Sequence, residues 1–166
     1  SAASDVYKRQ VTDNGDGTLT AKAGKGKFTN TYATVKDDIL IQMNGTKTID
    51  TNGVEGLTPP VLKDNFTFNI EALGEAPKPT NTTAETDENG NVDFGIATFN
   101  SSLLEGVTAA EDGSRTKEFK YEVTEVKGNL PGVTYDTEKK TFTVTLKDDG
   151  NGNLSATTSN ADGQAL

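Results

Sequence analysis

Three polar residues occupy positions that strand alternation assigns to a buried face. They are Lys47 in ILIQMNGTKTI (39–49), Glu125 in EFKYEVTEV (118–126) and Asn30 in FTNTY (28–32). Side chains alternate between the two faces of a strand, so residues of one parity lie together. Each polar residue shares its phase with the apolar residues of its own strand, which are Ile39, Ile41, Met43 and Ile49, then Phe119, Tyr121 and Val123, and lastly Phe28 and Tyr32. Unpaired charges on such a face cost several kcal/mol, so this pattern calls for a reason.

A lysine, a glutamate and an asparagine together in a dry site can form a covalent bond. Removal from water favours the neutral, nucleophilic form of an amine and the protonated form of a carboxylic acid. The amine can then attack the asparagine carboxamide, release ammonia and leave a Lys–Asn isopeptide bond between strands. Such a cross-link stabilises a fold much as a disulfide does. A second interpretation stays open on parity alone: a β-bulge near Gly45 shifts the phase and leaves all three residues solvated.

The composition excludes several other kinds of site. The 166 residues contain no Cys, no His and no Trp, which removes disulfides, Cys- or His-based zinc sites and Ser-His-Asp triads. The net charge of -9 and the pI near 4.5 disfavour nucleic acid and anionic membrane surfaces as partners. No apolar stretch approaches the length of a transmembrane helix.

Short alternating runs separated by turn dipeptides predict an antiparallel β-sandwich. We expect strands over 18–22, 26–32, 38–43, 65–73, 92–99, 118–126 and 140–148. Asn-Gly and Asp-Gly pairs such as Asn89-Gly90 and Asn151-Gly152 mark hairpin turns. We expect residues 74–91, which are polar and contain two prolines, to form a long exposed loop.

An internal repeat suggests how the chain is divided. VTDNGDGTLTA (11–21) matches LKDDGNGNLSA (146–156), which is typical of an array of domains. We therefore expect residues 11–32 to be the tail of a preceding repeat, and residues 33–166 to be the next domain without its last strand. Residues 1–10, SAASDVYKRQ, resemble a translated sequencing adapter, because Asp-Val-Tyr-Lys-Arg-Gln reverse-translates to GAT GTG TAT AAG AGA CAG. We exclude them from fold reasoning.

Five motifs in order resemble a known family. NGTKTI, FTFNIEAL, NGNVDFGIATF, YEVTEV and VTYDTEKKTFTVTLKDDGNGNL are together similar to the streptococcal-pilin-type isopeptide linkage domain. That family occurs in backbone pilins and in tandem surface proteins of Gram-positive bacteria. The resemblance covers residues 11–166 and implies an all-β, Ig-like fold of the CnaB type, with no cofactor and no metal.

The resemblance also implies roles for the three polar residues. Lys47 would be the amine donor, Glu125 the proton shuttle, and Asn30 the acceptor for the upstream domain. The acceptor for Lys47 would lie shortly after Leu166, so we expect this chain alone not to form its own bond.

The implied function is mechanical rather than enzymatic. The chain would be a stalk repeat of an extracellular, wall-attached or pilus-like protein, with neighbouring repeats as partners and any host ligand bound at a tip elsewhere. The alternative is an adhesive module that binds a host glycoprotein or carbohydrate.

One rival motif points to a cation. Asp87, Asn89, Asn91 and Asp93 have spacing like that of an EF-hand loop, but Val92 stands where the loop needs glycine and Thr98 where it needs a closing glutamate. A hairpin turn is the better interpretation of this stretch.

Overall fold

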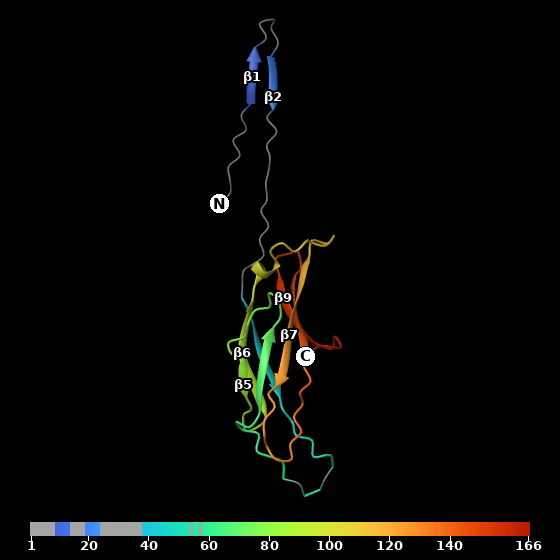
Figure 1. Ribbon diagram of the computed structural model, residues 1–166. Helices are drawn as coiled ribbons and strands as arrows, with labels where there is room; N and C mark the ends of the chain where they lie inside the picture. Colours follow the sequence, from blue (N-terminus) through green and yellow to red (C-terminus); the bar gives the residue numbers. More distant parts are fainter. Residues whose placement is uncertain (1–8, 14–18, 24–37, 54, 57) are drawn as a thin grey trace. The chain divides into compact units, whose positions relative to one another are not determined.

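The computed structural model describes residues 9–13, 19–23 and 38–166, apart from 54 and 57 (Figure 1). The chain divides into two compact units, residues 1–32 and 33–166. In the first unit, β1 (Arg9–Asp13) pairs with β2 (Leu19–Ala23) as an antiparallel hairpin. β1 begins inside the segment that resembles an adapter, so that segment contributes Arg9 and Gln10 to a strand. The predicted strand over 26–32, which carries Asn30, lies outside the described residues.

The second unit is built from antiparallel sheets, which confirms the predicted all-β fold class. The smaller sheet pairs β3 (Ile39–Thr46) with β6 (Asn91–Phe99). The larger sheet has the order β5-β4-β7-β8-β9. Its strands are β5 (Thr83–Glu85), β4 (Thr67–Ala72), β7 (Arg115–Glu125), β8 (Lys140–Asp148) and β9 (Leu154–Asn160). A 3-10 turn, η1 (Ser101–Leu104), follows β6. No helix in the described part of the chain is long and apolar enough to cross a membrane.

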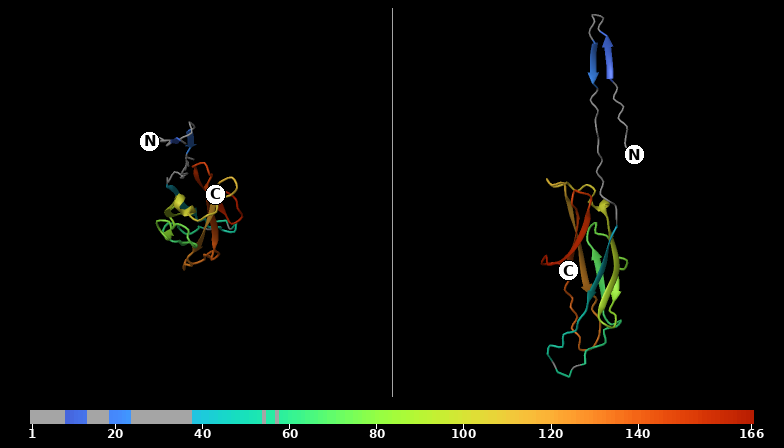
Figure 2. Two further views of the ribbon diagram at one scale, coloured as in Figure 1. Left: turned by 90° about the horizontal axis from the view of Figure 1, so that it is seen from above. Right: turned by 180° about the vertical axis from the view of Figure 1, so that it is seen from behind.

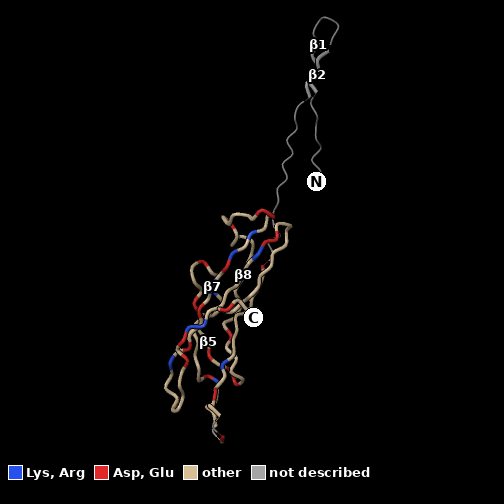
Figure 3. Tube along the Cα trace, turned by 90° about the vertical axis from the view of Figure 1, so that its right-hand side faces the viewer, with Lys and Arg blue, Asp and Glu red and all other residues tan. Residues whose placement is uncertain are grey.

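The two sheets enclose one hydrophobic core. The inward phase of β7 supplies Phe119 and Tyr121, and β8 supplies Val144 and Leu146 from the neighbouring strand. Phe99 of β6 meets Phe119 edge-on with 5.5 Å between ring centroids, which joins the small sheet to the large one. Figure 2 shows the β3–β6 pair lying against the five-stranded sheet. Lys and Arg are interspersed with Asp and Glu along this unit (Figure 3).

The stretch from residue 74 to residue 91 differs from the exposed loop that the sequence predicted. It contains β5, and Ala76, Pro79 and Thr86 within it are buried. The hydroxyl of Tyr121, a core residue, donates a 2.7 Å hydrogen bond to the carbonyl of Pro77, and burial raises the pKa of that hydroxyl. Pro77 and Pro79 therefore lie in a segment that this hydrogen bond holds against the sheet, rather than in an exposed loop.

The sandwich is closed along one side and open along the other. Near β5, the Asn81 amide donates a 2.8 Å hydrogen bond to the Phe94 carbonyl of β6, which links the two sheets. On the other side, β3 pairs only with β6 among the described strands, so its second edge is unpaired there. At the far end of the large sheet, Ala165 forms a bridge to Ser159 of β9.

Candidate functional site

Lys47 lies directly after β3, one residue beyond the last pair of that strand with β6. The register of β3 against β6 shifts between Met43 and Asn44, but the extra residue lies on β6, whose buried positions change there from Val92 and Phe94 to Ala97 and Phe99, so the phase of β3 itself is not shifted. The solvated lysine that this interpretation expected does not follow. The Lys47 side chain is only 13% exposed, because it keeps the phase of Ile39, Ile41 and Met43, whose side chains face the other sheet. Its backbone amide donates a 2.8 Å hydrogen bond to the carbonyl of Gly90.

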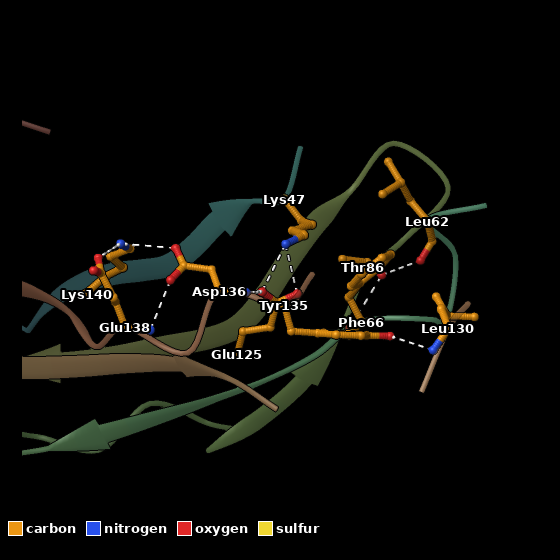
Figure 4. Close-up of polar contacts among 10 residues, drawn as sticks. All are labelled: Lys47, Leu62, Phe66, Thr86, Glu125, Leu130, Tyr135, Asp136, Glu138 and Lys140. Carbon is orange, nitrogen blue, oxygen red and sulfur yellow. Dashed lines mark hydrogen bonds and ion pairs between the residues drawn. The ribbon is translucent and has the colours of Figure 1, made fainter. Parts of the chain in front are cut away.

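Glu125 ends β7 and meets the lysine directly. Its side chain is 3% exposed, with Oε1 2.9 Å and Oε2 3.0 Å from the Lys47 amine (Figure 4). Oε2 also accepts a 3.0 Å hydrogen bond from the Asp136 amide, which fixes the carboxylate from the opposite side. Oε1 is also buried, and its polar contact among the described residues is the Lys47 amine, which leaves its second lone pair unused there. The site therefore keeps one acceptor position open beside the amine.

Aromatic rings form the apolar wall of this site. The Lys47 amine lies 5.1 Å from the ring centroid of Phe66, which is fully buried. The Tyr135 ring packs against Phe66 with 5.7 Å between centroids, and its hydroxyl accepts a 3.3 Å hydrogen bond from the Leu130 amide. These rings limit the access of water to the ion pair, so its charges interact more strongly than they would at the surface.

The loop that covers Glu125 carries its own charge network. Asp136 accepts a 3.0 Å hydrogen bond from the Glu138 amide and lies 3.1 Å from the Lys140 amine. The Glu138 amide is the largest cause that lowers the pKa of Asp136; the Lys140 hydrogen bond and the charges of Lys140 and Lys47 add to it. The pKa of Lys140 is raised, first by its hydrogen bond to Glu138 and then by Asp136.

A groove runs from this site along the unpaired edge of β3. Next to the ion pair is a hollow of about 230 Å³, whose lining includes Lys47, Glu125 and Asp136. It shares Thr46, Phe68, Val123 and Lys140 with a second hollow of about 250 Å³. The second hollow has a mainly apolar lining that includes Met43, Ile70, Val92, Phe94 and Phe142. The groove thus offers an apolar channel that ends at a lysine and a glutamate.

A family model described as "Spy0128-like isopeptide containing domain" matches residues 43–166. The chain belongs to this family. The match includes Lys47 and Glu125 and stops short of Asn30, and it confirms the resemblance read from the five motifs. The Spy0128-like isopeptide domain is the isopeptide domain of streptococcal pilins, and its members are structural repeats rather than enzymes. No curated protein and no solved structure matches the chain.

The structure of this Spy0128-like domain brings together two of the three predicted site residues. Lys47 and Glu125 are both on the buried faces that strand phase assigned to them and are in contact, while Asn30 lies outside the described residues. Sequence reasoning missed Phe66, Tyr135 and Asp136. Phe66 precedes β4 in a stretch quoted only as a strand, and the other two lie in a loop, where alternation gives no phase.

Three of the residues with EF-hand-like spacing, Asp87, Asn89 and Asn91, form the hydrogen bonds of the turn. Asp87 Oδ1 accepts hydrogen bonds from the amides of Asn89 and Asn91, each at 2.8 Å, and the Asn91 side chain bonds Oδ2. These contacts, led by the Asn91 side chain, lower the pKa of Asp87. Within the described residues, no cluster of three or more acidic side chains could hold a metal ion.

Proposed function

We propose that this chain is a shaft repeat of a bacterial surface or pilus-like protein, and that Lys47 forms an isopeptide bond with an asparagine. The observation that carries the proposal is the direct contact of the Lys47 amine with the Glu125 carboxylate in a site walled by Phe66 and Tyr135. A buried ion pair without a further role is a poor source of stability, because desolvation offsets the attraction between its charges. A pair that transfers a proton, by contrast, requires an amine and a carboxylate in direct contact and shielded from water.

The proposed step balances with the groups that are present. Lys47 passes one proton to Glu125 and becomes a neutral amine, which attacks the side-chain carbonyl carbon of the asparagine. Glu125 then returns this proton to the departing nitrogen and takes the second proton of the Lys47 nitrogen as the tetrahedral intermediate collapses. The C–N bond to the carboxamide nitrogen breaks, the C–N bond to Lys47 forms, and one ammonia leaves. The buried Oε1 of Glu125, whose polar contact among the described residues is the Lys47 amine, has a second lone pair that can accept a hydrogen bond from the carboxamide.

The acceptor would be a strand that lies along the unpaired edge of β3. A segment of the type FTNTY alternates aromatic and polar residues, so its rings would fill the apolar groove while its asparagine faces Lys47. The similarity of 11–21 to 146–156 supports an equivalent segment that would follow Leu166. By the same logic, Asn30 would be the acceptor for a lysine in the preceding repeat, and residues 11–32 would be the tail of that repeat.

A bond at this position suits a protein that carries tension. It would close a loop of roughly a hundred residues or more, for which the chain-entropy model gives about 5 kcal/mol of stabilisation. For a domain of this size, that corresponds to a rise in Tm of about 15 °C. We accordingly propose an extracellular, wall-attached location, with neighbouring repeats of the same chain as partners.

The test is the intact mass of the chain extended after Leu166 by a copy of residues 28–32. We expect this protein to be lighter than its sequence by one ammonia, and Lys47→Ala, Glu125→Ala and replacement of the appended asparagine by alanine to abolish the loss. Lys120→Ala, which removes an exposed lysine of β7 outside the groove, should leave the loss intact. Peptide mapping must place the bond on Lys47, because a succinimide at an Asn-Gly turn also loses ammonia. A parent mass equal to that of its sequence would refute the proposal.

A further inference from the structure

We propose that the turn between β5 and β6, residues 86–91, positions Lys47 for cross-linking, and that Gly90 is its positioning residue. This inference rests on the proposed function. It assigns a role to a segment that contributes no side chain to the Lys47–Glu125 pair, and it concerns the backbone that presents the amine.

Gly90 is in direct contact with the backbone of Lys47. The Lys47 amide donates a 2.8 Å hydrogen bond to the Gly90 carbonyl. A Cβ placed on Gly90 would lie 2.3 Å from the Lys47 carbonyl oxygen and 3.1 Å from a Leu62 methyl group. Ordinary contact begins at 3.4 Å, so a side chain here would push the Lys47 backbone away by about 1 Å.

The same turn also holds the aromatic wall below the amine. The Thr86 amide donates a 3.0 Å hydrogen bond to the Phe66 carbonyl, and the buried Thr86 hydroxyl donates to the carbonyl of Leu62 (Figure 4). Thr86 thus fixes the segment that carries Phe66, and Gly90 fixes Lys47. One short turn sets the amine and the ring beneath it relative to each other.

Lys47 needs this support because the ladder of β3 has already ended. The register shifts after Met43, and the last pair of the two strands is Thr46 with Asn91. Beyond that pair, the hydrogen bond to Gly90 is the backbone contact that continues the strand direction at Lys47. A displacement of about 1 Å between reacting groups costs on the order of a hundredfold in rate, so this contact governs reactivity.

The chain contains two matched control glycines. Gly152 occupies the same position in the hairpin 149–153, where Asp149 caps its turn as Asp87 does, and its φ is +98°. A Cβ on Gly152 would meet nothing within 4 Å. Gly95 combines a φ of +79° with a close contact, 2.8 Å to Thr80, but it does not touch Lys47. Alanine at Gly152 therefore tests backbone strain alone, and alanine at Gly95 tests strain with steric overlap.

The experiment uses the full chain extended by the copy of residues 28–32, made by cell-free translation and quenched with acid at successive times. Ammonia loss is followed by intact mass. We expect Gly90→Ala to slow the reaction about ten- to a hundredfold, and Gly95→Ala and Gly152→Ala to stay within about twofold of the parent. Thermal unfolding of the chain without the extension shows that each variant is folded, and the Lys47 amide resonance should shift only in Gly90→Ala.

Thr86 provides a second series that leaves the glycine intact. Thr86→Val removes the hydroxyl and should slow cross-linking several-fold, and the conservative Thr86→Ser should restore the parent rate. This pair decides the question if Gly90→Ala does not fold.

The outcomes separate this inference from the proposed function. A parent that loses no ammonia overturns both. A parent that reacts, with Gly90→Ala as fast as the controls, overturns the positioning role alone. Equal slowing of all three glycine variants also overturns it, because backbone strain would then be the cause. Equal cross-linking rates for Thr86→Val, Thr86→Ser and the parent would also overturn the positioning role.

Discussion

The contact between Lys47 and Glu125 predicts an unusual order of stabilities among single and double variants of the chain without the appended copy of residues 28–32. Lys47→Met leaves the Glu125 carboxylate, 3% exposed, without its partner. Removing one member of a buried pair costs about 3 to 5 kcal/mol, because the remaining charge is uncompensated. Glu125→Gln leaves Lys47, which is 13% exposed and can reach water more easily. We therefore expect Glu125→Gln to be the milder change.

The double variant Lys47→Met/Glu125→Leu should be close to the parent in stability or above it. Replacing both members of a buried ion pair by apolar residues is often neutral or stabilising. Phe66 and Val123 already supply apolar neighbours for such side chains. The two single changes therefore should not add, and their coupling should exceed about 2 kcal/mol.

Urea unfolding of the four proteins, followed by circular dichroism, measures this cycle. With an m-value of about 2 kcal/mol/M, Lys47→Met should lower the unfolding midpoint by about 2 M. Lys120→Met, an exposed lysine on β7, is the matched control and should change it little. Single variants within about 0.5 kcal/mol of the parent, together with an additive double variant, would show that the pair is solvated and that our reasoning about burial is wrong.

Two further changes test the surroundings of the site. The pKa of Asp136 is lowered in the folded state, so its carboxylate stabilises the fold above its unfolded pKa, and this stabilisation is lost as pH falls through the folded pKa. Asp136→Asn should therefore make the free energy of unfolding less dependent on pH in the acid range. An unchanged dependence in acid titrations of the variant would contradict this. Tyr121→Phe should lower the free energy of unfolding in urea by about 1 to 2 kcal/mol, because the Pro77 carbonyl loses its hydrogen bond. Tyr135→Phe should cost less, because the Tyr135 hydroxyl only accepts a long hydrogen bond from the Leu130 amide. Equal losses would show that the Tyr121 hydroxyl does not hold the segment around Pro77 against the sheet.

Much of the fold could be predicted because it follows from local rules. Alternation placed strands close to the observed β3, β4, β6, β7 and β8, since one buried face per strand imposes a period of two. Asn89-Gly90 and Asn151-Gly152 fall in turns, since glycine accepts the positive φ found there. β5 was missed because three residues are too few to show a period, and β9 because its alternating residues are mostly small and polar.

The candidate site, too, could be predicted from the sequence only in part. Parity alone put Lys47 and Glu125 on buried faces, because the phase of a strand is a local property of its sequence. Only the tertiary structure decided that these two residues, 78 positions apart, meet at 3.0 Å, that Phe66 and Tyr135 wall them in, and that Gly90 holds the lysine backbone. Such contacts depend on which strands and loops pack together, and that choice is made by the burial of the whole core rather than by any single stretch of sequence.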